Sequence, residues 1–321
     1  MKKIISLDSY ALNPDDNPFC DIASLEEITC YDFAAKSIEE TIDRIGDAEI
    51  VILNKTIINR EVIDACPNLK FISVAATGYN VIDSSYAAEK GIKISNVPIY
   101  GTTTVSEHTF ALIFALARRV ELNSNDVIQN SGWTKNQDWT YWLSPQIELA
   151  GKTLGIIGFG NIGKSVGRIG AAMGMKIIAF DAVKEHEVGY PVEIKTLDAV
   201  FSESDILSLH CPALPSTMNM INAENLNKMK ENAFLINCSR GQLVVEQDLA
   251  DALNNARIAG AALDVLQIEP PQEDNPLLSA KNCIITPHLA WATLDARQRI
   301  AKTVIDNIKA FKAGQPINVV N

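Results

Sequence analysis

The stretch that most constrains the fold of this chain is Lys152–Asp181, which predicts a strand, a glycine turn, a helix and a second strand. Thr153–Gly158 is short and apolar, as is typical of a parallel strand buried on both faces. Gly158, Gly160 and Gly163 follow in the pattern G-x-G-x-x-G. The first glycine of this pattern permits a tight turn, the second lets the backbone approach a pyrophosphate, and the third lets the helix pack closely on the strand. We therefore predict a phosphate-binding turn at the end of a buried strand.

The residues after the turn add an acidic group where a dinucleotide needs one. The helix presents its partly positive N-terminus to the phosphates, Gly174 ends it, and Lys176–Phe180 forms the next strand. Asp181 closes that strand, where a carboxylate binds the ribose hydroxyls of adenosine and repels the 2′-phosphate of NADP. An isolated G-x-G-x-x-G also occurs in ordinary glycine turns, but here the strands, the helix and the acid stand together. We expect NAD as the cofactor, in preference to NADP.

The acidic composition limits the partners that the chain can bind. Its 321 residues suffice for two domains, and a net charge of −11 with an isoelectric point near 4.9 argues against nucleic acid or an anionic membrane as a partner. The longest apolar run, 110–117, is too short to span a bilayer. Six dispersed cysteines without a C-x-x-C pair indicate reduced thiols, so we expect a cytoplasmic protein, and we expect no metal site. An acidic enzyme with an anionic substrate also needs a local cation in its site.

The order of apolar segments predicts two α/β domains. Four strands alternate with helical patterns in the first 100 residues, which indicates a mostly parallel sheet. These strands are Lys3–Leu7, Glu49–Leu53, Phe71–Val74 and Ile92–Ser95. Later strands are predicted at 205–210, 233–238, 258–265 and 283–286. With the two around the glycine turn they make six, the number in a full dinucleotide-binding sheet.

A last helix, 294–313, is expected to return and pack on the first domain. The predicted fold is therefore two-domain α/β, in which a doubly wound Rossmann cofactor domain is inserted in a smaller, flavodoxin-like substrate domain.

Three further segments each admit two interpretations. The loop 75–80 either exposes backbone amides that hold a carboxylate or is a simple turn into the next helix. The helix 102–120 is apolar almost all round and is expected to be buried; His108 on it is more often a hydrogen-bonded core residue than a catalytic one. The loop 131–145 carries three tryptophans without periodicity, which favours a subunit interface over a loop folded onto its own domain.

Three polar side chains follow successive strands of the predicted dinucleotide sheet. The guanidinium of Arg240 suits a carboxylate and a neighbouring carbonyl oxygen. Glu269 lies beyond the next strand, and His288 follows the last one. A carboxylate bonded to one imidazole nitrogen fixes the tautomer and favours the protonated ring, so His288 would donate a proton to a carbonyl oxygen. Each residue alone has an ordinary explanation, but three at successive strand ends favour a site for hydride transfer to a keto acid.

With these motifs in place, the chain resembles the D-isomer-specific 2-hydroxyacid dehydrogenases essentially from end to end. The resemblance rests on GFGNIG at 158–163, HCPALPSTMNMIN at 210–222, NCSRGQLV at 237–244, ALDV at 262–265, IEPP at 268–271 and TPHLAWAT at 286–293. It implies a substrate domain of residues 1–100 and 288–321 and an NAD-binding Rossmann domain of residues 101–287. It also implies a homodimer formed through the cofactor domain, in which the tryptophan-rich loop would take part.

The resemblance further implies roles for particular residues. Arg240 would bind the substrate carboxylate, Glu269 would partner the histidine, and His288 would act as acid and base. The substrate would also contact Ala76, Thr77 and Gly78. Cofactor contacts are implied at Thr104, Gly158, Gly160, Asn161, Ile162, Gly163, Asp181, His210, Pro212, Thr217, Cys238, Arg240, Asp264 and His288. Cys238 stands where the family often has threonine, so its contact is expected through the backbone.

Two segments narrow the substrate. TYWLSPQIELAGK before the glycine turn and HLAWATLDARQR after the histidine resemble the hydroxypyruvate reductase, or glycerate dehydrogenase, branch. Tyr79 and Asn80 follow the substrate loop, with no adjacent lysine or arginine to neutralise a phosphate. The sequence also shows none of the regulatory domain that many phosphoglycerate dehydrogenases carry. We therefore expect NADH-dependent reduction of hydroxypyruvate to D-glycerate, with glyoxylate as a side substrate.

Two alternatives stay open. The first is a D-lactate dehydrogenase or another D-2-hydroxyacid dehydrogenase. The second is a non-catalytic NAD sensor similar to the C-terminal-binding-protein corepressors, which share the fold and these motifs. The intact set of Arg240, Glu269 and His288 and the compact length of the chain favour an enzyme.

Overall fold

The structure, a computed structural model, describes residues 4–13, 28–183 and 187–321. It divides the chain into two compact units, the first of residues 1–101 with 291–321 and the second of residues 102–290. We expected the chain to re-enter the first unit after residue 287. The boundary falls after Ala290 instead, because the N–H groups of Leu289 and Ala290 donate hydrogen bonds to the Asp264 carboxylate of the second unit. Each unit is described by itself below.

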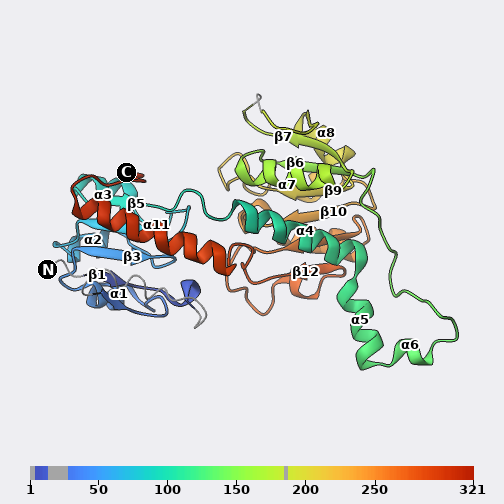
Figure 1. Ribbon diagram of the computed structural model, residues 1–321, viewed down its shortest axis with the longest axis horizontal. Helices are drawn as coiled ribbons and strands as arrows, with labels where there is room; N and C mark the ends of the chain where they lie inside the picture. Colours follow the sequence, from blue (N-terminus) through green and yellow to red (C-terminus); the bar gives the residue numbers. More distant parts are fainter. Residues whose placement is uncertain (1–3, 14–27, 184–186) are drawn as a thin grey trace. The chain divides into compact units, whose positions relative to one another are not determined.

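The first unit is built on a parallel sheet with the strand order β2-β1-β3-β4-β5 (Figure 1). The strands are β1 Ile4–Ser6, β2 Ile28–Cys30, β3 Ile50–Leu53, β4 Phe71–Val74 and β5 Lys93–Ser95. This order is the one of flavodoxin-like folds, as expected. Strand β2 was not predicted, because at the sheet edge Ile28 is only partly buried, Thr29 and Cys30 are exposed, and the three form no apolar run. Lys3, where the first predicted strand begins, lies outside the described residues.

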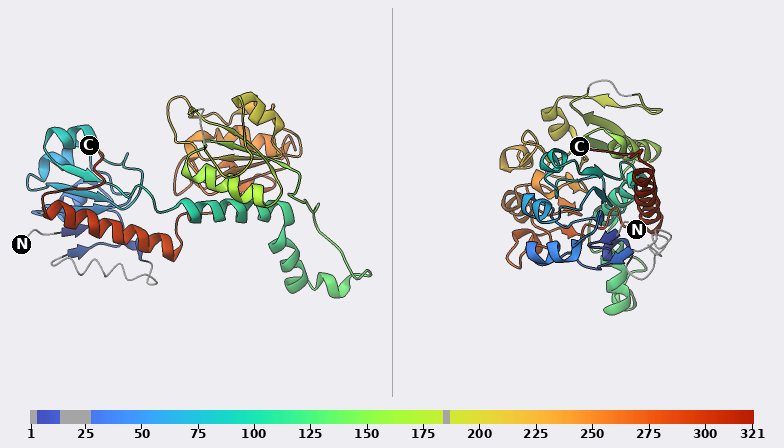
Figure 2. Two further views of the ribbon diagram at one scale, coloured as in Figure 1. Left: turned by 45° about the horizontal axis from the view of Figure 1, so that its top comes forward. Right: turned by 90° about the vertical axis from the view of Figure 1, so that its left-hand side faces the viewer.

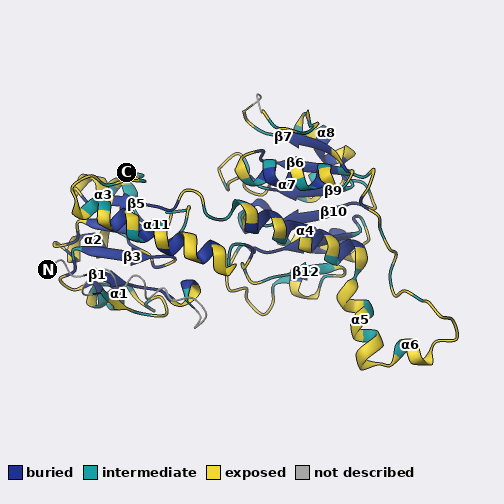
Figure 3. Cartoon of the chain, in the orientation of Figure 1, coloured by how far each residue is buried: buried dark blue, intermediate teal, exposed yellow. Residues whose placement is uncertain are grey.

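Three helices cover one face of this sheet: α1 (Ile38–Ile45), α2 (Arg60–Ala65) and α3 (Ser84–Glu89). Each begins after a residue whose side chain accepts a backbone N–H of the first turn, which is why the helices start where they do. These capping residues are Ser37, Asn59 and Asp83. The apolar sides of the helices pack on alternate strand residues, and the strands form the buried interior seen in Figure 3.

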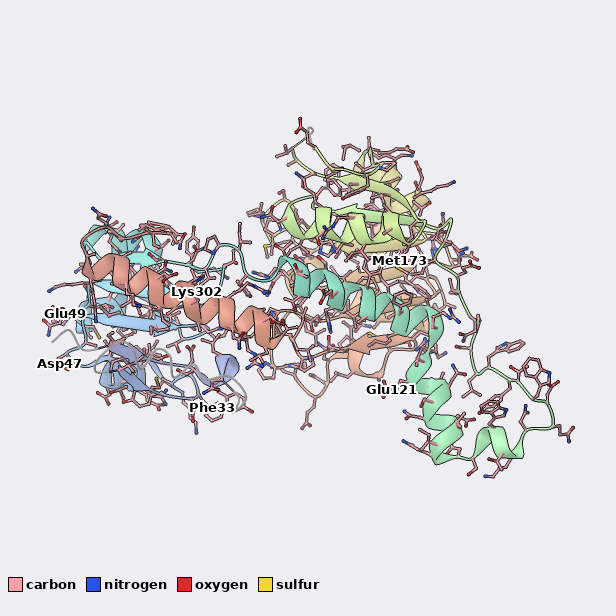
Figure 4. All side chains as sticks on the ribbon, viewed as in Figure 1. Phe33, Asp47, Glu49, Glu121, Met173 and Lys302 are labelled. Atoms are coloured by element: carbon pink, nitrogen blue, oxygen red, sulfur yellow. The ribbon has the colours of Figure 1, made fainter. Side chains whose placement is uncertain are left out.

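Helix α11 (Leu294–Lys312) covers the other face of the same sheet. Thr293 caps it by accepting the N–H of Ala296. Phe311 near its end stacks on Phe71 of β4, with ring centroids 4.4 Å apart. Lys302 lies on the exposed side of the helix (Figure 4). The last helix therefore packs on the first sheet, and both faces of that sheet are covered, as its unbroken apolar strands require.

The second unit contains a larger parallel sheet with the order β12-β11-β10-β9-β6-β7-β8 among the described residues. The strands are β6 Thr153–Ile157, β7 Lys176–Phe180, β8 Glu193–Ile194, β9 Ile206–Leu209, β10 Phe234–Asn237, β11 Gly260–Leu263 and β12 Cys283–Ile285. The chain order reverses between β6 and β9, which is the switch point where doubly wound folds bind ligands. Six strands were predicted and seven are present. The additional strand, β8, has two exposed residues at the edge and so carries no apolar signal.

Helices lie on both faces of this sheet as well (Figure 2). One face is covered by α4 (Thr102–Arg118) and α7 (Asn161–Ala172), and the other by α8 (Leu197–Glu203), α9 (Ala223–Leu226) and α10 (Glu246–Asn254). We predicted that α4 would reach residue 120. It ends at 118 because Arg119 has a left-handed φ of +46°, which interrupts the helix before the next one begins.

An arm of residues 120–145 projects from the second unit (Figures 1 and 2). It contains α5 (Val120–Gln129) and α6 (Gly132–Lys135), and neither helix has a buried residue. The short helix α6 lies within the segment 131–145, which was predicted as a loop without periodicity. Trp139 is 82% exposed and Trp142 is 65% exposed, so these rings do not fold onto their own domain. Glu121, also exposed, lies near the base of the arm (Figure 4).

Among the described residues, no helix is both long and apolar enough to cross a membrane. No group of three or more histidine, cysteine, aspartate or glutamate side chains is arranged to hold a metal ion in the same part of the chain.

Candidate active site

The glycine turn between β6 and α7 leaves open space at one of its three glycines. Gly158 has a φ of +91°, and a Cβ there would lie 2.4 Å from the backbone nitrogen of Cys211. A Cβ at Gly163 would lie 2.2 Å from the carbonyl oxygen of Gly158, so both positions require glycine. Nothing in the structure lies within 4 Å of a Cβ at Gly160. Gly160 therefore leaves room for a group from outside the chain.

Polar groups beside the turn fit a dinucleotide. Helix α7 starts with Asn161 and Ile162, whose N–H groups have no carbonyl partner within the helix. Asp181 follows β7, and its Oδ2 accepts the N–H of Phe159 at 2.5 Å, which ties the carboxylate to the turn. The Oγ1 of Thr104, on α4, is buried and has no hydrogen-bond partner among the described residues. A phosphate-bearing and hydroxyl-bearing ligand would satisfy these groups.

Four further residues implied as cofactor contacts follow β9 and β10. His210 is half-buried, its Nε2 lies 2.8 Å from the Oγ of Ser208, and burial lowers its pKa to about 4, so the ring is neutral at physiological pH. Pro212 is exposed, and the hydroxyl of Thr217 donates to its carbonyl oxygen at 2.6 Å, which closes this loop. Burial raises the pKa of the Cys238 thiol to about 12. Cys238 is therefore a neutral thiol and not a nucleophile.

Arg240 lies at the carboxyl edge of three neighbouring strands. β10, β11 and β12 are adjacent and parallel, so the loops that carry Arg240, Glu269 and His288 leave the sheet at the same edge. Arg240 is exposed, and its Nη1 donates to the carbonyl oxygen of Ser239 at 2.7 Å. A Cβ at Gly241 would lie 1.9 Å from the carbonyl carbon of Leu266. The Arg240 turn is thus packed against the chain that leads to Glu269.

Glu269 and His288 form a direct pair. The Oε2 of Glu269 lies 2.5 Å from the Nδ1 of His288, and its Oε1 accepts the N–H of Leu266 at 3.1 Å. Because an ionised carboxylate only accepts hydrogen bonds, Nδ1 carries a proton and Nε2 is left to face a ligand. The side chains of His288 and Glu269 are 27% and 33% exposed, so a ligand can reach them. This arrangement can hold an imidazole in one tautomer and deliver a proton from Nε2.

In the first unit, the loop Ala76–Gly78 follows β4. The hydroxyl of Thr77 donates to the carbonyl oxygen of Val97 at 2.8 Å, and the carbonyl oxygen of Thr77 accepts from the Nδ2 of Asn96 at 2.8 Å. The N–H groups of Thr77 and Gly78 donate no hydrogen bond within the part of the chain that the structure describes. A rigid loop with available amides fits a carboxylate, as the first interpretation of loop 75–80 requires.

A basic residue that was not predicted, Lys55, follows β3 of the first sheet. Asp8, buried after β1, accepts the N–H groups of Asn54, Lys55 and Thr56, each at 2.7 Å. These bonds hold the exposed Lys55 at the end of β3, which pairs directly with β4. No lysine or arginine is adjacent to the loop 76–78 in the sequence, whereas Lys55 follows the strand that neighbours β4 in the sheet. Only the order of the strands could have revealed it.

Comparisons with known proteins agree with this geometry. Residues 110–290 match the family model "D-isomer specific 2-hydroxyacid dehydrogenase, NAD binding domain". The chain is 47% identical to a hydroxypyruvate reductase of Blautia hydrogenotrophica over 99% of both chains. It is 42% identical to a glycerate dehydrogenase of Methylorubrum extorquens over 88% of both chains. A solved structure of a D-lactate dehydrogenase from Aquifex aeolicus, complexed with NAD and lactic acid, matches with a TM-score of 0.83 and 29% identity, over 98% of this chain and 96% of that one.

The fold and the site together define an NAD-dependent oxidoreductase. The chain belongs to the D-isomer-specific 2-hydroxyacid dehydrogenase family. The family, the enzyme class, the cofactor and the two-domain α/β fold are therefore confirmed. The roles of individual residues stay predictions.

Proposed function

We propose that this enzyme reduces hydroxypyruvate to D-glycerate with NADH. The observation that carries the proposal is the Glu269–His288 pair, which lies on strand ends next to the one that carries Arg240. A keto acid needs a proton donor and a cation for its carboxylate, and these three residues supply both. The choice of hydroxypyruvate is supported by the two relatives named above, a hydroxypyruvate reductase and a glycerate dehydrogenase.

The reaction assigns one task to each of the three residues. When bound, NADH supplies a hydride to the carbonyl carbon of the substrate and is oxidised to NAD. His288 donates its Nε2 proton to the carbonyl oxygen, so that the C=O group becomes a CH–OH group. Glu269 keeps the ring oriented and stabilises the imidazolium from which that proton leaves. Arg240 binds the substrate carboxylate and polarises the neighbouring carbonyl. In the reverse direction His288 takes the proton back.

The two units would divide the binding tasks. We assign residues 102–290 to the cofactor, with the phosphates at the glycine turn and Asp181 on the adenosine ribose. The residues implied as cofactor contacts by the family resemblance all belong to this unit. The first unit would hold the substrate, with the amides of Ala76–Gly78 on its carboxylate. The available N–H groups of Thr77 and Gly78 support this assignment.

We further propose a homodimer formed through the second unit and the arm 120–145. The exposed rings of Trp139 and Trp142 support it, because large exposed aromatic side chains on a projecting segment are typical of an interface. A cytoplasmic location is part of the same proposal. It is supported by Cys66, Cys211, Cys238 and Cys283, which form no disulfide among the residues that the structure describes.

The residue roles are tested by two variants. His288→Ala should lower kcat for hydroxypyruvate on the order of 10² to 10⁴, because the proton donor is lost. Arg240→Ala should lower kcat and raise KM together, because it removes a contact beside the reacting carbon. Steady-state kinetics measure both, fluorescence titration shows whether NADH still binds, and Lys302→Ala, on the exposed side of α11, is the control. A loss smaller than about tenfold in His288→Ala would mean that the proton comes from elsewhere.

A further inference from the structure

His108, which has no task in the proposed reaction, contacts the turn that carries His288. It lies on α4, and 17% of its side chain is exposed. Its Nε2 lies 3.2 Å from the Oγ1 of Thr286 and 3.6 Å from the Oδ1 of Asp264. Thr286 directly follows β12 and Asp264 directly follows β11. The His108 side chain of α4 thus contacts the ends of β11 and β12. Glu269 and His288 lie on the loops that follow these two strands.

The direction of these hydrogen bonds follows from the donors that are present. The Thr286 hydroxyl has a single proton, and it donates this proton to the Oδ1 of Asp264 at 2.5 Å. Because that proton is already used, the Thr286 oxygen accepts its second bond from His108. Burial lowers the pKa of His108 and outweighs the opposing attraction of Asp264. His108 is therefore a neutral imidazole with its proton on Nε2.

Asp264 is hydrogen-bonded to the backbone around His288. Its side chain is almost fully buried, its Oδ1 accepts the N–H of Leu289 at 2.9 Å, and its Oδ2 accepts the N–H of Ala290 at 2.8 Å. The carbonyl oxygen of Asp264 accepts the N–H of His288 at 2.9 Å. These bonds hold His288 at a φ of +53°, a left-handed conformation that a non-glycine residue rarely adopts without support. The Asp264 carboxylate thus fixes the backbone that directly follows His288.

We propose that His108 is a positioning residue for His288. Its Nε2–H fixes the hydroxyl of Thr286, this hydroxyl fixes the Asp264 carboxylate, and the carboxylate holds the turn 286–290. The turn keeps His288 against Glu269, ready to transfer its proton. The inference rests on the proposed role of His288. Without the His108 donor, the Thr286 hydroxyl has a free acceptor site and the carboxylate loses one constraint on its orientation.

The test uses the full-length enzyme and compares two substitutions at the same position. His108→Leu keeps the volume but removes the donor, whereas His108→Gln keeps an N–H at a similar reach. His108→Leu should lower kcat for hydroxypyruvate by about tenfold or more, because a displaced catalytic group loses rate steeply. KM and the NADH affinity should change by less than about threefold, because neither ligand loses a contact. His108→Gln should recover most of the rate. Glu107→Gln, at the exposed neighbouring position, is the control.

A second route keeps the test decisive if His108→Leu does not fold. Thr286→Val removes the hydroxyl with little change of shape, and it should reproduce the kcat loss. In soluble variants, adding His108→Leu to Thr286→Val should cause no further loss, because both act through the same hydrogen bond. The inference is overturned if either single variant keeps wild-type kcat, or if Gln restores no more rate than Leu does. His288→Ala separates the two proposals: if it is slow while His108→Leu is fast, only the inference about His108 fails.

Discussion

At the scale of single residues, the three glycines of the turn are glycine for different reasons. Gly158 and Gly163 are enclosed by backbone atoms of their own unit, whereas Gly160 faces open space. The motif alone treats the three as one pattern. The structure separates them into two that the fold requires and one, Gly160, that the fold does not require.

This separation leads to a matched pair of substitutions. Gly163→Ala should lower the free energy of unfolding by about 1–3 kcal/mol or more, because its Cβ would press on a backbone carbonyl that cannot move aside. Gly160→Ala should leave the stability within about 0.5 kcal/mol, because its backbone is unstrained and its Cβ meets nothing. It should nevertheless weaken NADH binding, because the methyl group takes the room expected for the pyrophosphate. Thermal unfolding and NADH fluorescence titration measure the two effects. Normal NADH affinity in Gly160→Ala would place the phosphates elsewhere.

The position of a residue in the site could be predicted where a local sequence motif contains it. It could not be predicted where it depends on a contact with a residue far away in the sequence. Arg240, Glu269 and His288 follow predicted strands, and that alone brings them to one edge of a parallel sheet. His108 was interpreted as a hydrogen-bonded core residue, which is correct as far as it goes. Its partner, Thr286, is 178 positions away, and nothing local indicates the contact. Lys55 was missed for the same reason.

At the scale of elements, buried strands and helices were predictable and edges were not. A strand covered on both faces must be apolar throughout, so runs such as 50–53 and 206–209 are visible in the sequence. The edge strands β2 and β8 are short and partly or fully exposed, and they carry no such signal. The end of α4 depends on the left-handed conformation of Arg119. Because this residue is not a glycine, the sequence does not indicate that the helix ends there.

The arm 120–145 is the element on which the proposed dimer depends. The double variant Trp139→Ser/Trp142→Ser should convert the proposed dimer to a monomer, because it removes two large exposed rings from the segment expected to bind the partner. Light scattering coupled to gel filtration gives the mass. Ile57→Ser, which removes a comparably exposed apolar residue from the first unit, should leave the mass unchanged. A wild-type chain that is monomeric at micromolar concentration would exclude the dimer.

At the scale of the whole molecule, the chain builds one parallel sheet, leaves it for a second, and returns for a final helix. This order was predictable because strands and helices alternate along the sequence. Helix α11 also has an apolar face, and no strand follows it in the sequence, so it must pack on a sheet formed earlier in the chain. The exact point of return was not, since it depends on hydrogen bonds from residues 289 and 290 to Asp264. The choice among 2-keto acids is the part of the account that the fold constrains least, because all of them share the carboxylate and carbonyl that the proposed site recognises.

The central claim is therefore tested most directly by substrate preference. We would measure NADH oxidation with hydroxypyruvate, glyoxylate, pyruvate, 3-phosphohydroxypyruvate and a branched 2-keto acid at matched concentrations. The account predicts that hydroxypyruvate leads in kcat/KM by about tenfold or more, which corresponds to about 1.4 kcal/mol of transition-state binding. A lead for 3-phosphohydroxypyruvate would contradict the proposed substrate. Turnover of none of these acids by an enzyme that still binds NADH would contradict the proposed reaction itself.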